Sequence, residues 1–86
     1  MNELPIEKFG STHLEFRYFP SKTGKTLIWN VCNKDEGLMI GRVSWHGPWR
    51  KYCFFPIPDC VWSSDCLEDL ATFISLKNAE RKNEGL

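Results

Sequence analysis

The residues with the most contact chemistry lie in one stretch of this chain, Trp45 to Pro56, with the sequence WHGPWRKYCFFP. A Gly-Pro turn separates its two tryptophans and is followed by Arg50 and Lys51. Aromatic rings bury large apolar areas, and Trp, Tyr and Arg are also enriched at the energetic centres of interfaces. The stretch is therefore either core or a recognition surface, whose rings would stack or fill a pocket while its cations bind phosphate or carboxylate.

Strand geometry limits which of these side chains can act together. Consecutive side chains of a strand point to opposite faces, so Arg50 and Lys51 form one patch only if the turn twists them together. We assign Trp45 to the core beside Val43. The candidate binding residues are four side chains at the Gly-Pro turn and the start of the next strand and a cation from the preceding strand: His46, Trp49, Arg50, Lys51 and Arg42.

The four cysteines and two histidines do not favour a metal site or a catalytic centre. Structural zinc ligands usually come in pairs about two to four residues apart, whereas Cys53, Cys60 and Cys66 are separated by six and then five residues. Cys66 opens a predicted helix, a position that can activate a thiol, but no histidine neighbours it in sequence. We expect no catalytic residue, no metal and no cofactor, and therefore no enzyme.

Length and charge limit the class of protein further. A chain of 86 residues forms one domain with one modest core. Eleven Lys and Arg balance eleven Asp and Glu, which removes the broad attraction behind non-specific nucleic-acid binding but leaves a local basic patch possible. No apolar run suits a secretory signal or a membrane span, so we expect a cytoplasmic protein with reduced thiols and no membrane association.

Apolar and polar residues alternate with the two-residue period of half-buried strands in four segments. The predicted strands cover residues 14–19, 26–32, 38–45 and 49–55, separated by turns rich in Gly, Asn and Pro. The apolar positions of the third strand change parity near Gly41, and a glycine inside a strand often marks a β-bulge. We therefore predict a bulge at Gly41.

Residues 65–81 have the three- and four-residue apolar spacing of an amphipathic helix, with Asp65 as its N-cap and basic residues late. The predicted fold is therefore α+β: a four-stranded antiparallel meander packed by one C-terminal amphipathic helix. Residues 1–12 are expected to form a loosely ordered N-terminal arm, residues 13–82 a single ββββα domain, and residues 83–86 a C-terminal tail.

Three segments of the chain carry a resemblance to known sequences. They are IGRVSW from Ile40, WRKYCFFP from Trp49 and CLEDLATFI from Cys66. This half of the chain resembles small uncharacterised proteins of bacteriophages and prophage regions, which share a W…WRKYxFFP strand and a CLxDIAxFI helix. Leu70 stands where that pattern has isoleucine. The resemblance implies a phage or prophage origin and a bacterial host cytoplasm, but no activity.

Our leading hypothesis is a small non-enzymatic binding module that acts stoichiometrically on a host protein, through the sheet face that the helix leaves uncovered. One alternative is a single-stranded nucleic-acid or nucleotide binder that uses Trp, Arg and Lys on the sheet. Another is a structural homodimer that pairs edge strands. The sequence leaves the partner's identity and the choice between monomer and homodimer open.

Overall fold

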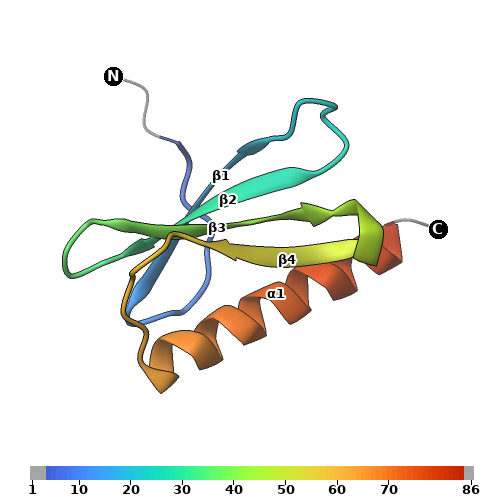
Figure 1. The fold of residues 1–86 in the computed structure, drawn as a ribbon. Helices are drawn as coiled ribbons and strands as arrows, with labels where there is room; N and C mark the ends of the chain where they lie inside the picture. The colour runs from blue at the N-terminus through green and yellow to red at the C-terminus, as the bar shows by residue number, and fades with distance from the viewer. Residues whose placement is uncertain (1–3, 85–86) are drawn as a thin grey trace.

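The computed structural model describes residues 4–84 of the chain. Its four strands form one antiparallel sheet in the order β1-β2-β3-β4, and a single long helix lies against one face (Figure 1). The predicted α+β fold is confirmed. The elements are β1 (Leu14–Pro20), β2 (Leu27–Asn33), β3 (Met39–His46), the 3₁₀ turn η1 (Gly47–Trp49), β4 (Lys51–Pro56) and α1 (Ser64–Glu84).

The core lies between the sheet and α1 because the alternating apolar side chains of all four strands point to that side. Phe16 on β1 stacks on Phe73 of α1, with ring centroids 3.9 Å apart and planes 8° from parallel. Trp29 contacts the same phenylalanine edge-on, at 5.4 Å. The buried apolar side chains are Leu14, Phe16, Trp29, Val31, Ile40, Val43, Tyr52, Leu70 and Phe73.

The helix begins before the predicted position. Ser63, rather than Asp65, caps it: the Ser63 Oγ accepts a hydrogen bond from the Cys66 N–H at 3.2 Å. Serine satisfies the free donors of a first turn as well as aspartate does, so the prediction of Asp65 as N-cap was wrong by two residues. Within α1, Leu70 and Phe73 are buried, whereas Leu67 is 51% exposed.

The predicted bulge is present, centred one residue before Gly41. Val31 pairs with Gly41, while the next residue, Cys32, pairs with Met39, so Ile40 is the extra residue of β3. Ile40 and Gly41 are consequently both buried. Position 41 favours glycine because a β-carbon there would lie 2.4 Å from the Cζ of Phe54 and 2.8 Å from the backbone carbonyl oxygen of Phe55.

The connection between β3 and β4 is longer than predicted. Residues Gly47–Trp49 wind into a 3₁₀ turn with Pro48 near its start, and Arg50 closes it in the left-handed conformation, with φ 54° and ψ 46°. Strand β4 therefore begins at Lys51, not at Trp49. Trp49 and Arg50 therefore precede the strand, and their side chains need not point to alternate faces of the sheet.

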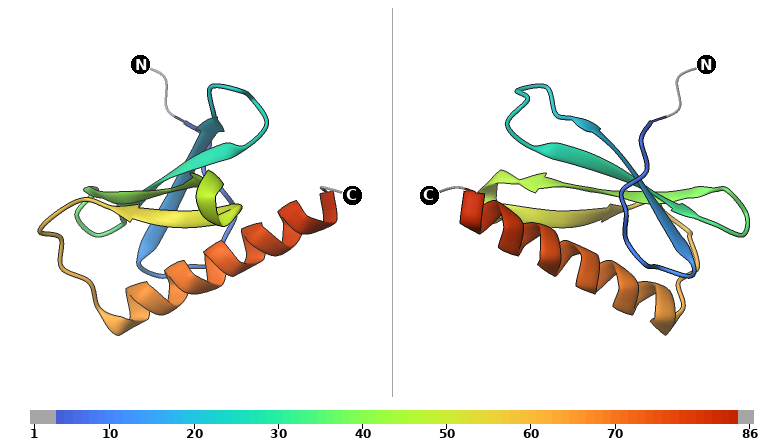
Figure 2. Two further views of the ribbon diagram at one scale, coloured as in Figure 1. Left: turned by 45° about the vertical axis from the view of Figure 1, so that its right-hand side comes forward. Right: turned by 180° about the vertical axis from the view of Figure 1, so that it is seen from behind.

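Residues 4–12 of the segment predicted as a loosely ordered arm lie against β1 and the core (Figure 2), and residues 1–3 of that prediction lie outside the described residues. The Glu7 N–H donates to the Phe16 carbonyl at 2.7 Å, and the Tyr18 N–H donates to the Pro5 carbonyl at 3.0 Å. Phe9 then packs edge-on against Phe16, with ring centroids 5.5 Å apart. This segment extends the sheet at β1 and covers one side of the core.

Among residues 4–84, no helix is long and apolar enough to cross a membrane.

Candidate functional site

Three rings gather on the sheet face opposite α1. His46 lies between Trp49 and Phe55, with ring centroids 5.0 Å and 5.9 Å away and both contacts edge-on. Trp49 is 66% exposed and Phe55 is 40% exposed. We term His46, Trp49 and Phe55 the aromatic patch. A single exposed ring is ordinary on a protein surface, but contiguous exposed rings are typical of binding sites.

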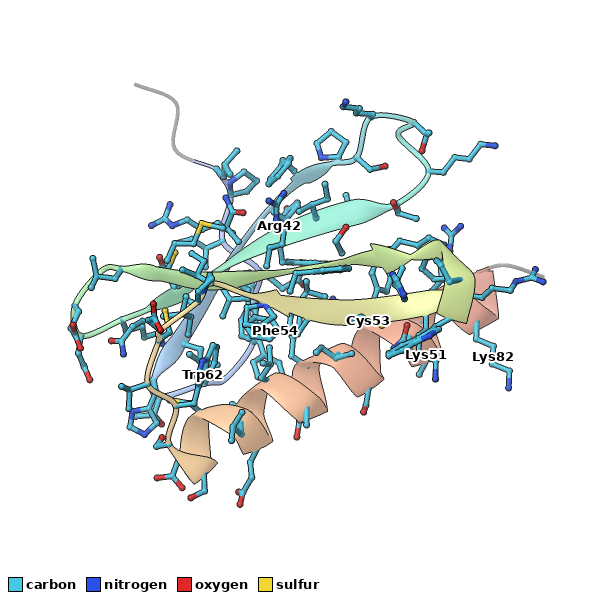
Figure 3. The ribbon with its side chains drawn as sticks, viewed as in Figure 1. Arg42, Lys51, Cys53, Phe54, Trp62 and Lys82 are labelled. Carbon is cyan, nitrogen blue, oxygen red and sulfur yellow. The ribbon has the colours of Figure 1, made fainter. Side chains whose placement is uncertain are left out.

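The strands and the turn position the aromatic patch together. His46 ends β3 opposite Lys51, and four residues earlier Arg42 lies opposite Phe55, so these side chains share the uncovered face. Trp49 reaches the same face from η1. Arg42, Ser44 and Phe55 line a shallow pocket beside the rings. Figure 3 shows Arg42 on β3, and it shows Phe54 and Trp62 between the sheet and α1. Arg42 therefore supplies a cation next to the patch.

A second site lies where β4 begins and α1 ends. Side chains from both elements line a groove of about 620 Å³, which we term the basic groove. The Arg81 guanidinium lies over the Trp45 ring, 5.3 Å from its centroid. Figure 3 shows Lys51 and Lys82 at this same end of the molecule. The lining residues are Trp45, Arg50, Lys51, Asn78, Arg81 and Lys82, with no acidic side chain among those that the structure describes.

The structure distributes the five predicted binding residues over two adjoining sites, which meet where Lys51 lies opposite His46. His46, Trp49 and Arg42 lie at the aromatic patch. Arg50 and Lys51 line the basic groove together, because the left-handed backbone of Arg50 turns the chain just before the strand begins. The condition stated for Arg50 and Lys51 to form one patch, that the turn twists them together, is therefore met. Phe55, Arg81 and Lys82 were missed by the sequence-based selection.

One signal in the sequence would have found the groove. In a meander followed by a returning helix, alternate connections lie at the same end of the molecule, as Figure 1 shows. The Arg81 guanidinium donates to the Lys25 carbonyl at 2.8 Å, which places the β1–β2 turn beside the end of α1. Basic residues predominate at this end of the molecule, and acidic residues predominate at the other. One end carries Lys22, Lys25, Arg50, Lys51, Arg81 and Lys82 against the acidic Glu80 and Glu84, and the other carries Asp35, Glu36, Asp59, Asp65, Glu68 and Asp69 against the basic Lys34.

Thiol chemistry on the uncovered face is suppressed at one position. Cys32 on β2 lies opposite Glu15 on β1. Burial raises the pKa of the Cys32 thiol, and the neighbouring Glu15 carboxylate raises it further. The thiol therefore stays protonated at neutral pH, the form that is not a nucleophile. Among residues 4–84, no three His, Cys, Asp or Glu side chains lie close enough together to hold a metal ion.

Comparison with known proteins finds no matching family model and no matching solved structure. An uncharacterised 9.3 kDa protein of Acholeplasma phage L2 is 38% identical over 58 residues, which cover 67% of this chain and 74% of the phage protein. The chain belongs to the family of this phage protein. This relative confirms the predicted resemblance to small uncharacterised phage proteins, while the two proposed motifs stay predictions.

Proposed function

We propose that this member of the phage L2 family is a non-catalytic binding module that acts stoichiometrically on a protein of the bacterial host cell. The observation that carries the proposal is the exposure of Trp49 and Phe55 around His46 on the uncovered sheet face. A small domain can insert such rings into a pocket of its partner. It then blocks that pocket by occupying it, without catalysing a reaction.

The composition of the patch suits a protein interface. Exposed Trp is the residue type most enriched at interface hot spots, where truncation to alanine costs about 2 kcal/mol or more. Because Trp49 is already exposed in the free protein, its ring contributes little to the stability of the fold and is available to a partner. Arg42 and Ser44 place polar groups beside the rings, as at the rim of an interface.

Contact through the face, rather than through a sheet edge, is supported by the edges themselves. Residues 5–7 pair with the outer side of β1. On the other side, Asn78 of α1 binds the backbone of Tyr52 on β4. Both contacts occupy backbone groups that a second strand would need, so we favour a monomer that binds through the aromatic patch over a homodimer that pairs edge strands.

The test compares three proteins as bait in a host-cell lysate, followed by titration calorimetry with the captured partner. Trp49→Ala should raise the dissociation constant by about 30-fold, the equivalent of about 2 kcal/mol of binding free energy. Its thermal midpoint should change little. Leu76→Ala is the matched control, because Leu76 is 44% exposed on α1, away from the patch. Its affinity should equal that of the wild type.

One result would count against the proposal, and another would change the variant that tests it. If Trp49→Ala binds the partner as tightly as the wild type, the aromatic patch is not the contact. If Trp49→Ala unfolds instead, the ring has a structural role, and Phe55→Ala then becomes the variant that decides whether this face binds.

A further inference from the structure

The basic groove concentrates positive charge from two distant parts of the chain. Arg50 and Lys51 come from the start of β4, and Arg81 and Lys82 come from the last turns of α1. None of the ion pairs among residues 4–84 includes any of these four side chains. A concave surface lined by one sign of charge focuses the electrostatic field and attracts a counter-ion. The zero net charge of the chain therefore conceals a locally cationic site.

The helix dipole explains the position of two of these four cations but not of the other two. Cations in the last turn of a helix are favourable because they lie at the negative end of the helix dipole, which explains Arg81 and Lys82. Arg50 and Lys51 belong to the β3–β4 connection and gain nothing comparable there. Their addition to the same groove raises repulsion between like charges, and a bound anion would remove that repulsion.

The backbone of Arg50 is a second indication of function. Arg50 closes η1 with φ 54° and ψ 46°, in the left-handed region that glycine and asparagine adopt more readily. Holding another residue there costs about 1 kcal/mol or more, and such residues cluster at functional sites. Glycine would serve the turn better than arginine does. The side chain of Arg50, which lines the groove, therefore has a use that the fold alone does not require.

The groove also offers a flat surface. The Arg81 guanidinium lies 5.3 Å over the ring centroid of Trp45. Planar guanidinium groups and aromatic rings are the surfaces on which proteins stack unpaired bases. An acidic peptide would use the cations but not this plane. Cations beside an aromatic ring and a guanidinium group therefore fit a chain that alternates phosphates with bases.

We propose that the basic groove binds single-stranded nucleic acid, with its four cations on the phosphates and the Arg81–Trp45 pair beneath a base. This site adjoins the aromatic patch, because Lys51 lies opposite His46, but it uses other side chains and does not depend on the proposed protein partner. The acidic connections at the opposite end of the molecule confine the strand to the basic end.

The experiment measures fluorescence anisotropy of a labelled ten-nucleotide oligothymidylate at several salt concentrations. Four phosphate contacts on a single strand predict a slope of about −2.8 in the plot of log affinity against log salt. Affinity should therefore fall about 50-fold between about 50 and 200 mM salt. The Arg50→Gly/Lys82→Gln double variant should halve the slope and show only about a 7-fold fall over the same range.

Two features keep this test clear of folding artefacts. Arg50→Gly relieves the left-handed backbone, so the double variant should have an unchanged or higher thermal midpoint. Lys8→Gln is the matched control, since Lys8 is exposed on the N-terminal segment and does not line the groove. Its salt slope should equal that of the wild type.

The proposal fails if the oligonucleotide does not bind at about 50 mM salt, or if the double variant keeps the wild-type slope. A decaglutamate peptide is the decisive competitor. If it displaces the oligonucleotide at equal charge concentration, the groove selects acidic chains of any kind and the assignment to nucleic acid is wrong. Failure of the peptide to compete supports the role of the Arg81–Trp45 pair.

Discussion

The side-chain amide of Asn78 on α1 binds both backbone groups of Tyr52 on the edge strand β4. The Asn78 Oδ1 accepts the Tyr52 N–H at 2.7 Å, and the Asn78 Nδ2 donates to the Tyr52 carbonyl at 3.2 Å. In an antiparallel sheet, alternate residues of an edge strand direct both groups away from the neighbouring strand. The amide therefore takes the place of a fifth strand at this position, and α1 protects the edge as well as the core.

Asn78→Ala should destabilise the protein by about 1 to 3 kcal/mol, because it leaves two partly buried backbone groups without partners. Urea denaturation followed by circular dichroism measures the loss. The exposed edge should also promote self-association, which light scattering would detect as mass that increases with concentration. Asn78→Asp keeps the acceptor for the Tyr52 N–H and should lose less stability. An unchanged urea midpoint for Asn78→Ala would show that water replaces the amide without cost.

Gly41→Ala should destabilise the protein by about 1 to 3 kcal/mol through overpacking. The added β-carbon would lie 2.4 Å and 2.6 Å from two ring atoms of Phe54 and 2.8 Å from the Phe55 carbonyl oxygen. The Phe54 side chain could move away only by changing χ1, and the Phe55 oxygen belongs to the paired strand β4 and cannot move alone. Thermal denaturation should show a midpoint at least about 5 °C lower.

Gly10→Ala is the control for this substitution, because a β-carbon at position 10 would meet nothing within 4 Å. It should leave the midpoint unchanged or raise it slightly, since alanine restricts the unfolded chain. Equal midpoints for the two variants would mean that the sheet relaxes around residue 41 more easily than its paired geometry suggests.

The fold could be predicted because its signals are local. The alternation around Phe16 and the helical spacing of Leu70 and Phe73 each depend on a few neighbouring residues, and each placed an element within two or three residues of its observed bounds. The start of β4 could not be predicted. Gly47 and Pro48 indicate a turn, but its length depends on the left-handed conformation of Arg50, a residue type that seldom adopts it.

The candidate sites were predictable only in part. The turn residues around Trp49 were recognisable from their types, yet their separation into a patch and a groove depends on the same backbone conformation. Arg81 and Lys82 lie about thirty residues further along the chain, and they reach Arg50 only because α1 crosses back under the sheet. Such a contact depends on packing between elements, and local patterns do not encode it.

Lys77 should make the stability of the protein fall at alkaline pH. Its ammonium lies 3.0 Å from Glu7 and 3.1 Å from Glu80. Burial lowers the pKa of Lys77, but the hydrogen bonds and charges of the two carboxylates outweigh burial and raise it above 10.5. The folded state then holds this proton more tightly than the unfolded state. The stabilisation is complete below pH 10.5 and is lost as the pH rises through the higher folded-state pKa.

The measurement is the free energy of unfolding of the wild type and Lys77→Gln at neutral pH and at about pH 11.5. The wild type should be the more stable protein at neutral pH, and the difference should shrink at the alkaline value. Lys8→Gln, which removes an exposed lysine elsewhere, should follow the wild type at both. A difference between wild type and Lys77→Gln that does not depend on pH would assign the role of Lys77 to packing against Trp29 and Phe73.

Cys32 should react slowly with disulfide reagents in the folded protein. Burial raises the pKa of this thiol, the Glu15 carboxylate raises it further, and Arg17 opposes the rise in part. The thiolate is the reactive form of cysteine. Because the pKa of Cys32 is raised, a smaller share of it is thiolate near pH 8 than of an ordinary cysteine.

In a variant whose other cysteines, Cys53, Cys60 and Cys66, are replaced by serine, the reaction with an aromatic disulfide should be slower than after unfolding in urea. Adding Glu15→Gln should speed the reaction of the folded protein, because it removes the charge that disfavours the thiolate. If that change leaves the rate as it was, burial alone controls Cys32.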